Sequence, residues 1–362
     1  MGKSHYIIPI FVPHEGCPHN CVFCNQSSIT GSNLKVNASF VKDTVERYLK
    51  TIPREKSTIE VSFFGGTFTA INIEKQNELL EIAKIYKDNG SIDCIRLSTR
   101  PDYINNEILE NLKKHEVDII ELGIQSLDKE VLLASGRGHS EADVISASHL
   151  IKKYNFKLGH QIMVGLPGDD FQKDIETAKK IISLSPSICR IYPALVIKNT
   201  AMEKMYFNGE YNPYTLDEAI SICKIIYGMF MVNNIKVIRI GLQPTDEISE
   251  DGDLIAGPFH PAFRELVEGS LYSDMILSNV NLDYEGEVEI LINEKDISKL
   301  YANKKQFFND MKKQLATKCI NVKQDNKVER ECLVVTIGKT CNKLSIIDYL
   351  LKKYKAGYLN IL

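Results

Sequence analysis

Three cysteines near the amino terminus have the residue type and the spacing to hold an iron–sulfur cluster. Cys17, Cys21 and Cys24 form a Cys-x3-Cys-x2-Cys pattern just after an apolar run, whereas the other six cysteines are scattered. Three thiolates bind three irons of a 4Fe-4S cluster and leave the fourth iron open. An open iron can chelate the amino and carboxylate groups of S-adenosylmethionine (SAM) and pass one electron to its sulfonium, which releases a 5′-deoxyadenosyl radical.

Other uses of these cysteines stay open. A zinc site in a binding module would need a fourth ligand, for which His14 or His19 is available. A haem or metal chaperone could use the same cysteines. A catalytic thiolate would need one cysteine only, and three crowded thiols would compete for oxidation. Zinc knuckles usually combine two Cys-x-x-Cys pairs, whereas this triplet stands alone. The pattern therefore favours the iron–sulfur cluster.

The composition is that of an ordinary globular chain. Its 362 residues are 44% hydrophobic and 25% charged, with a net charge of −3, and this length suits about two domains. No stretch approaches the ~18 uncharged apolar residues of a membrane span, and the start lacks the apolar core of a signal peptide. We therefore expect a cytoplasmic protein without membrane contact, in which the cysteines stay reduced.

Up to residue 240, short β-branched runs alternate with amphipathic segments of helical length. The expected strands are residues 6–12, 58–64, 94–98, 117–124, 157–164, 188–195 and 235–240. The expected helices are residues 39–51, with Ser39 as the N-cap, and 73–87, 105–115, 140–154, 169–184 and 215–233. Repeated βα units predict a parallel sheet closed into a complete or partial barrel. A doubly wound sheet is the alternative, but the first βα loop lacks a Gly-x-Gly-x-x-Gly pattern.

The last part of the chain has a different pattern. Strands are expected at residues 287–293, 319–323 and 331–337, and helices at 296–316 and 344–354. We therefore expect two domains, residues 1–275 and 276–362, the second a small α+β domain. Residues 281–362 carry 15 Lys/Arg and 11 Asp/Glu, a charge of +4, which leaves −7 for residues 1–280. The lysines of the second domain are candidates for phosphate contact, although charges on a long helix usually form its solvated face.

Several motifs together resemble the radical SAM superfamily and, within it, the branch of the Elongator catalytic subunit. The resemblance covers the chain up to about residue 270 and rests on the cysteine triplet and on residues 64–68, 97–102, 121–126, 136–139, 157–168 and 190–193. It implies an α/β fold, a partial (β/α)6 TIM-like barrel of the radical SAM type with a small C-terminal α+β domain. It also implies a 4Fe-4S cluster and SAM as cofactors.

The resemblance assigns roles to residues that end successive strands. Gly65 and Gly66 would bring main-chain groups close to the methionine amino group of SAM, because glycine permits close backbone approach. Thr67 stands where most of the superfamily has Glu, a departure shared with the Elongator-like branch. Arg100, in a Thr-Arg-Pro-Asp signature, would lie near the SAM carboxylate or the substrate, with a surface salt bridge as the alternative.

The later strands would hold the adenosyl part of SAM. Gln125 would contact the ribose, Arg137 would face the cofactor, and Val164 with Leu166 would contact the adenine, while Gln161 would point into the barrel. The cluster ligands and catalytic residues are predicted to be Cys17, Cys21 and Cys24. The cofactor-binding residues are predicted to be Phe23, Gly65, Gly66, Thr67, Ser98, Arg100, Gln125, Arg137, Gln161 and Val164.

Four residues are predicted to bind the substrate. Tyr192 belongs to a Tyr-Pro element on the sixth strand, where it would act as a hydrogen-bonding wall or as a half-buried aromatic. Gln243, Phe259 and His260 lie in Gly-Pro-rich segments after the last barrel strand, which would close the barrel mouth over a planar ligand or serve as a linker.

The resemblance leaves the substrate open, because one barrel serves many chemistries. Only 16 residues precede Cys17 and about 80 follow the barrel, so we expect neither the basic arm nor the acetyltransferase domain of Elongator-like enzymes. The favoured substrate is therefore a small nucleobase, and the specific hypothesis is a queuine lyase that cleaves a carbon–nitrogen bond and releases 7-aminomethyl-7-deazaguanine. Modification of tRNA is the alternative. Either reaction would require an external one-electron reductant such as flavodoxin or ferredoxin.

Overall fold

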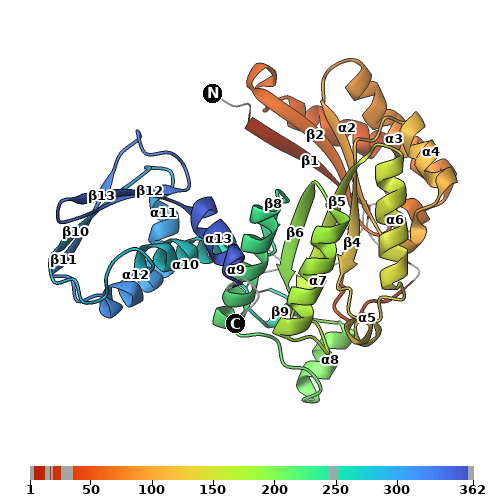
Figure 1. Ribbon diagram of the computed structural model, residues 1–362. Coiled ribbons are helices and arrows are strands. Elements are labelled where there is room, and N and C mark those ends of the chain that lie inside the picture. Colours follow the sequence, from red (N-terminus) through yellow and green to blue (C-terminus); the bar gives the residue numbers. More distant parts are fainter. Residues whose placement is uncertain are drawn as a thin grey trace. The chain divides into compact units, whose positions relative to one another are not determined.

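The computed structural model describes residues 4–12, 17, 19–25, 36–243, 249 and 252–357, and the chain forms two compact units (Figure 1). The first unit comprises Met1–Pro213 and Gln243–Gly257, and the second comprises Tyr214–Leu242 and Pro258–Leu362. The predicted boundary after residue 275 stays a prediction.

Six parallel strands form the framework of the first unit. They are β1 (Ser4–Val12), β2 (Ser57–Gly65), β3 (Cys94–Thr99), β4 (Ile119–Gln125), β5 (Lys157–Val164) and β6 (Ile188–Pro193). Each strand pairs with the next one along the chain. Because right-handed crossovers between consecutive parallel strands place every helix on the same face, this order belongs to a barrel wall and not to a doubly wound sheet. The barrel prediction is confirmed.

Helices lie along the outer side of this sheet (Figure 1). They are α2 (Ala38–Leu49), α3 (Ile73–Asp88), α4 (Asn106–Lys114), α6 (Glu141–Lys153) and α7 (Phe171–Leu184), whereas the short α5 (Lys129–Ala134) and α8 (Ala201–Phe207) lie at one end of the strands. Side-chain oxygens accept hydrogen bonds from first-turn amides at the start of each helix, for example Asp170 from Lys173 N at 2.8 Å. The cap of α2 is Asn37, which accepts from Phe40 N at 2.9 Å. The prediction that Ser39 caps this helix is therefore wrong, because the helix begins one residue before Ser39.

Alternation along the strands separates an apolar outer face from a polar inner face. The outward residues are buried under the helices, for example Ile8, Ile59, Leu97, Leu122 and Ile191, each of which is 0% exposed. The intervening positions of β2 to β6 carry Glu60, Ser62, Arg96, Ser98, Glu121, Gln161, Arg190 and Tyr192. Since buried parallel strands are ordinarily apolar on both faces, these polar residues set the inner face apart from a packed apolar core.

The second unit contains α9 (Leu216–Val232), β8 (Lys236–Ile240) and α10 (Phe263–Leu277), followed by a four-stranded sheet in the order β11-β10-β12-β13. These strands are β10 (Glu287–Ile292), β11 (Cys319–Gln324), β12 (Cys332–Ile337) and β13 (Thr340–Ser345), and β10 runs parallel to β11. The helices α11 (Ile297–Leu300), α12 (Ala302–Gln314) and α13 (Ile346–Lys355) complete the unit. It is an α+β structure, as predicted.

Two expectations for this region are corrected. The predicted single helix over 296–316 is interrupted, because α11 ends at Leu300 and residues 303–305 have left-handed φ angles of 51° to 68°. The helix α10 was not predicted, because its buried glycine and serines, Gly269, Ser270 and Ser273, weaken the apolar periodicity of its sequence. None of the helices formed by the described residues is both long and apolar enough to cross a bilayer.

A buried histidine makes the stability of the first unit depend on pH. His160 on β5 is 0% exposed, its Nε2 lies 3.0 Å from Ser148 Oγ, and burial lowers its pKa from 6.5 to about 3. Below pH 6.5 the unfolded chain therefore binds a proton that the folded chain rejects, and the free energy of unfolding falls as the pH falls toward 3.

We expect His160→Asn to reduce this acid sensitivity, because asparagine does not titrate. Between pH 7 and pH 5 the wild type should lose about 2 kcal/mol more of its unfolding free energy than the variant does. Urea unfolding at both pH values measures the difference, with the exposed His149→Asn as the control. Equal pH slopes for wild type and His160→Asn would contradict this account.

Candidate active site

The cysteine loop follows the carboxyl end of β1 and is anchored to two later segments of the first unit. Val22 N donates to Ser135 O at 3.1 Å, and Met202 N donates to Val22 O at 2.8 Å. Phe23, predicted to bind the cofactor, packs against a cluster formed by Val196, Met202 and Tyr211. The aromatic residue before the third cysteine therefore anchors the loop to the segment that follows β6.

Two polar side chains contact the cysteine thiols. Arg137 donates from Nη1 to Cys21 Sγ at 3.1 Å, and the Thr67 hydroxyl lies 3.5 Å from Cys17 Sγ. Arg137 is 6% exposed, and burial lowers the pKa of its guanidinium while the Cys21 thiol opposes this shift. A buried cation beside a thiol stabilises the thiolate that an iron–sulfur cluster needs.

The donor set fits an iron–sulfur cluster. Cys17, Cys21 and Cys24 form no disulfide and are all half-buried, and Arg137 offsets part of the negative charge that three thiolates would bring. Among the described residues, no three His, Cys, Asp or Glu side chains converge as ligands of a single metal ion. For the zinc alternative, His14 lies outside the described residues, and the His19 ring lies where a side chain on Gly138 would be.

The glycine pair that ends β2 requires its glycines. Gly65 has a φ of +108°, and a Cβ there would lie 2.9 Å from Val12 O. Gly66 N donates to the same carbonyl at 2.9 Å, so the turn is fixed against β1 and presents Thr67 to the first cysteine. An ammonium group needs acceptors, so the carbonyl oxygens of this turn are the atoms suited to the methionine amino group. That contact stays a prediction.

Arg100 is buried and already paired. Its Nε and Nη2 each donate to an Asp102 carboxylate oxygen at 2.9 Å, and Nη2 also donates to the carbonyl oxygen of Arg137. The side chain is 6% exposed, so this is a buried ion pair and not a surface salt bridge. The observed contacts make Arg100 a support for the segment that carries Arg137, and its predicted contact with the SAM carboxylate stays a prediction.

The ends of β4 and β5 place two glutamines together. Gln125 has a left-handed φ of 68°, next to a register irregularity between Gly123 and Gln125, and its Oε1 accepts from Gln161 Nε2 at 3.2 Å. Such a φ is costly for a residue other than glycine and occurs preferentially at functional sites. Val164 lies on the helix-facing side and is 1% exposed, so its side chain points away from the inner face, and its predicted adenine contact stays a prediction.

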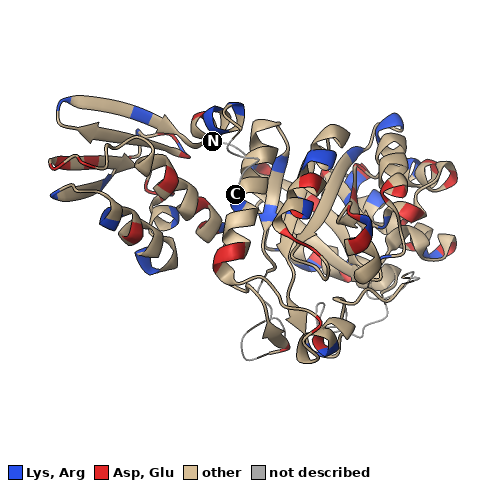
Figure 2. Ribbon diagram, turned by 60° about the horizontal axis from the view of Figure 1, so that its bottom comes forward, with Lys and Arg blue, Asp and Glu red and all other residues tan. Residues whose placement is uncertain are grey.

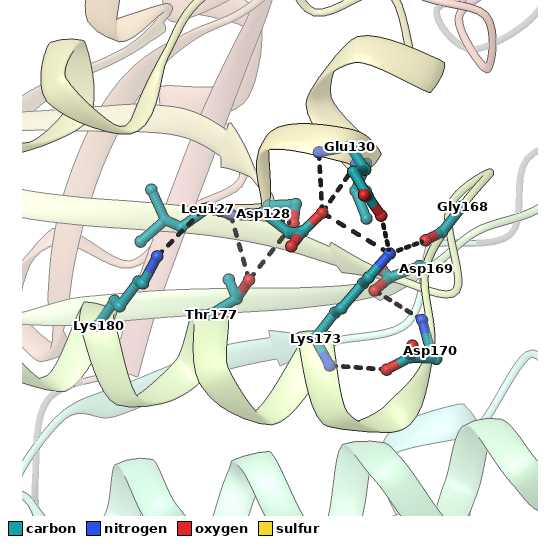
Figure 3. Close-up of polar contacts among 11 residues, drawn as sticks. Leu127, Asp128, Glu130, Gly168, Asp169, Asp170, Lys173, Thr177 and Lys180 are labelled. Carbon is teal, nitrogen blue, oxygen red and sulfur yellow. Dashed lines mark hydrogen bonds and ion pairs between the residues drawn. The ribbon is translucent and has the colours of Figure 1, made fainter.

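The loops that follow β4 and β5 are tied together by a lysine (Figure 3). Lys173 Nζ on α7 donates to Glu130 Oε2 and to Gly168 O, both at 2.8 Å, and lies 3.9 Å from the carboxylate of Asp128. Thr177 reaches the same β4 loop, where its hydroxyl accepts from Leu127 N at 3.2 Å. These contacts fix the segments that begin immediately after Gln125 and Val164.

A chain of ion pairs crosses the inner face of the barrel, and sequence reasoning did not assign it. Arg96 on β3 contacts Glu60 Oε2 at 2.8 Å and Glu121 Oε2 at 3.5 Å, and Arg190 Nε on β6 contacts Glu121 Oε2 at 3.1 Å. Glu60 is 0% exposed and Glu121 is 1% exposed. The sequence feature that could have indicated it is a charged residue within an otherwise mostly apolar strand, such as Glu121 within Ile119–Gln125.

The remaining predicted residues fall into two groups. Ser98 lies on the inner face of β3 beside Glu121 in register, and Tyr192 lies on the inner face of β6, where its hydroxyl accepts from Arg190 Nη1 at 3.2 Å. Gln243 belongs to the first unit, whereas Phe259 and His260 belong to the second. His260 Nδ1 accepts from Ala262 N at 3.1 Å just before α10. The predicted lid formed by these last three residues stays a prediction.

Two family models match this chain. The radical SAM superfamily model matches residues 11–181, and the model of the radical SAM C-terminal domain matches residues 186–273. Together with the cysteine triplet and the parallel barrel, these matches identify the chain as a member of the radical SAM superfamily, whose members use a 4Fe-4S cluster and SAM.

The chain is similar to Elongator-like proteins. It is 29% identical over 255 residues to the tRNA uridine(34) acetyltransferase of Methanocaldococcus jannaschii, a match that covers 60% of this chain and 47% of that protein. It is 26% identical over 195 residues to Elongator complex protein 3 of Homo sapiens, with 48% of this chain and 36% of that protein covered. The chain thus spans half or less of the length of these two relatives.

A solved structure supports the fold. An archaeal Elp3 from Methanocaldococcus infernus, with an amino-terminal deletion, superposes with a TM-score of 0.61 at 24% identity and covers 78% of this chain and 65% of that chain. At this identity the likeness shows the fold alone, and it agrees with the partial barrel and the α+β unit described above.

Replacement of a cluster ligand should abolish cluster assembly. After anaerobic reconstitution, Cys17→Ala should lack the absorbance near 400 nm and should not cleave SAM, because two thiolates cannot replace three. The control is the exposed Cys341→Ala, which should load iron like the wild type. Wild-type iron content and SAM cleavage in Cys17→Ala would refute the assignment.

Arg137 should tune the cluster electrostatically. We expect Arg137→Gln to lower the reduction potential, because removal of a buried cation beside a ligating thiolate disfavours the more negative, reduced cluster. A redox titration followed by electron paramagnetic resonance measures the shift, with the exposed Arg54→Gln as the control. An unchanged potential in a fully loaded Arg137→Gln variant would show that the contact has no electronic role.

Proposed function

We propose that this protein is a radical SAM enzyme that abstracts hydrogen from a nucleobase of tRNA. The observation that carries the proposal is the similarity of its radical SAM part to proteins named tRNA uridine(34) acetyltransferase and Elongator complex protein 3. The chain spans about half of the length of the acetyltransferases or less. We therefore propose the same class of substrate, a tRNA, but not the acetyl-transfer reaction.

The chain's own residues would have separate tasks in this reaction. Cys17, Cys21 and Cys24 would hold the cluster, and Arg137 would offset its charge. The Gly65-Gly66 turn and Gln125 would orient SAM at the carboxyl ends of the strands. When bound, the cluster supplies one electron to SAM and so generates the 5′-deoxyadenosyl radical. The electron would come from a protein such as flavodoxin or ferredoxin.

A second candidate is a reaction on a small nucleobase, with queuine cleavage to 7-aminomethyl-7-deazaguanine as the specific form. No comparison supports it, but the charge distribution favours it. Residues 1–280 carry a net charge of −7, and blue and red residues are interspersed on the helices of the first unit (Figure 2). Arg96, Arg100 and Arg190 each form an ion pair with a carboxylate of the first unit and lie away from its surface. Such a surface offers a poor footprint for a polyanion.

An anaerobic turnover assay separates the two candidates. Reconstituted enzyme with SAM and reduced flavodoxin is given bulk tRNA lacking wobble modifications, or queuine, or no substrate, and 5′-deoxyadenosine is followed by mass spectrometry. We expect tRNA to stimulate its formation about tenfold or more over the substrate-free rate, and the tRNA to gain a new modified nucleoside.

Two outcomes would change the conclusion. Stimulation by queuine alone, with release of 7-aminomethyl-7-deazaguanine, would replace the tRNA proposal by the lyase. Stimulation by neither substrate would overturn both candidates. The Cys17→Ala variant supplies the background, because any 5′-deoxyadenosine formed there does not come from the cluster.

A further inference from the structure

Arg190 on β6 lies on the inner face of the barrel, where it contacts three side chains. Its Nε lies 3.1 Å from Glu121 Oε2, its Nη1 donates to Tyr192 Oη at 3.2 Å, and its guanidinium carbon lies 4.9 Å from the ring centroid of Phe64. Its neighbours in the strand, Cys189 and Ile191, are buried against the helices, so Arg190 and Tyr192 share the inner face. Burial is the largest single influence and lowers the pKa of Arg190, but Glu121, Tyr192 and Glu60 together raise it by more, so the group stays a cation.

Arg190 Nε pairs with Glu121 by charge without forming a hydrogen bond, and two further donors of this pair have no partner. Among the residues that the structure describes, nothing accepts from Arg190 Nη2. Because Tyr192 Oη accepts from Arg190, its own hydrogen must point elsewhere, and no described residue accepts it. Gln161 is in register with Arg190 on the neighbouring strand, and its Nε2 is used by Gln125, which leaves its carbonyl oxygen as an acceptor. Two donors and one acceptor therefore belong to side chains on the same inner face.

The charges around this pair select the kind of group that it can bind. Glu121 balances Arg190, and Glu60 balances Arg96, so the inner face has no net charge from these four residues. An anion bound to Arg190 would lie near Glu121, which is buried and held by two arginines. A neutral carbonyl oxygen can accept both free donors without adding charge to a buried region.

We propose that Arg190 and Tyr192 recognise a neutral carbonyl group on a planar substrate ring, with Gln161 accepting from an adjacent ring N–H, and that Glu121 is a positioning residue that excludes anionic rings. The proposal rests on the proposed function for its assumption that the substrate is a nucleobase. Beyond that function, it identifies the ring edge that the enzyme would bind, the edge with a carbonyl and an N–H group, and it gives a reason why an anionic ring would bind weakly.

Equilibrium binding to the holoenzyme tests this proposal without turnover. The reconstituted protein with SAM, but without reductant, is titrated with uracil, a neutral ring with carbonyl and N–H groups, and with orotate, its carboxylated analogue. We expect uracil to bind and orotate to bind at least tenfold more weakly. Tyr192→Phe and Arg190→Lys should each weaken uracil about tenfold, because one removes a donor and the other removes the planar donor fork.

Matched variants provide the controls. Tyr154→Phe removes an exposed hydroxyl that contacts Asn106, and Arg54→Lys alters an exposed ion pair with Asp93, so both should bind uracil within twofold of the wild type. Cluster content and SAM affinity, measured for every variant, should not change. Wild-type uracil affinity in both Tyr192→Phe and Arg190→Lys, equal affinity for orotate and uracil, or no uracil binding by the wild type would each overturn the proposal.

Glu121→Gln tests the selectivity directly. The substitution leaves Arg190 with an uncompensated charge, so the affinity for orotate relative to that for uracil should rise at least tenfold over the wild-type ratio. If this variant fails to fold, the Tyr192 and Arg190 variants still decide the question. None of these binding experiments depends on radical chemistry. If neither tRNA nor queuine stimulated turnover, the proposed function would be refuted, but the proposal for Arg190 and Tyr192 would still be tested by the binding data.

Discussion

Charged side chains on the inner face of a parallel barrel have to be paired, and this requirement organises the first unit. Burial of an unpaired carboxylate or guanidinium costs several kcal/mol, so Glu60, Arg96, Glu121 and Arg190 can lie there only as a connected chain. The same chain keeps the inner face polar, whereas an ordinary barrel would fill this volume with branched apolar side chains. The inner face of the barrel thus consists in part of paired charges and hydrogen-bonding groups instead of apolar side chains alone.

The cysteine loop depends on contacts from distant parts of the chain. Phe23 packs against a cluster that includes Met202, and Arg137, supported by Arg100, reaches Cys21. Three thiolates on a short loop repel one another, so a buried cation and an apolar anchor are what such a loop needs to hold its shape. The segments after β4 and β5 are tied by Lys173 in the same way. The described parts of the cysteine loop and of the β4 and β5 loops are therefore held by contacts within the protein.

Strong local patterns made much of the fold predictable. The expected strand at residues 157–164 coincides with β5, and the other barrel strands agree to within two residues at nearly every end, because β-branched runs bounded by turn residues are distinctive. The helix over Phe263–Leu277 was missed because its small residues pack closely without an apolar stripe. The interruption of the helix over 296–316 was missed because polar residues such as Asn303 and Lys304 do not mark a break in sequence.

The sequence by itself determined the chemistry at the barrel rim, since the Cys-x3-Cys-x2-Cys spacing, the glycine pair and the βα repeats are local patterns that carry their own physical requirements. Only the tertiary structure decided which charges meet. Glu60, Arg96, Glu121 and Arg190 come from four strands, and their pairing depends on strand order and register. The same holds for Arg100, whose partner Asp102 is near in sequence but whose burial depends on the whole sheet. Contacts between residues far apart in sequence leave no local pattern, so they appear only when the chain is folded.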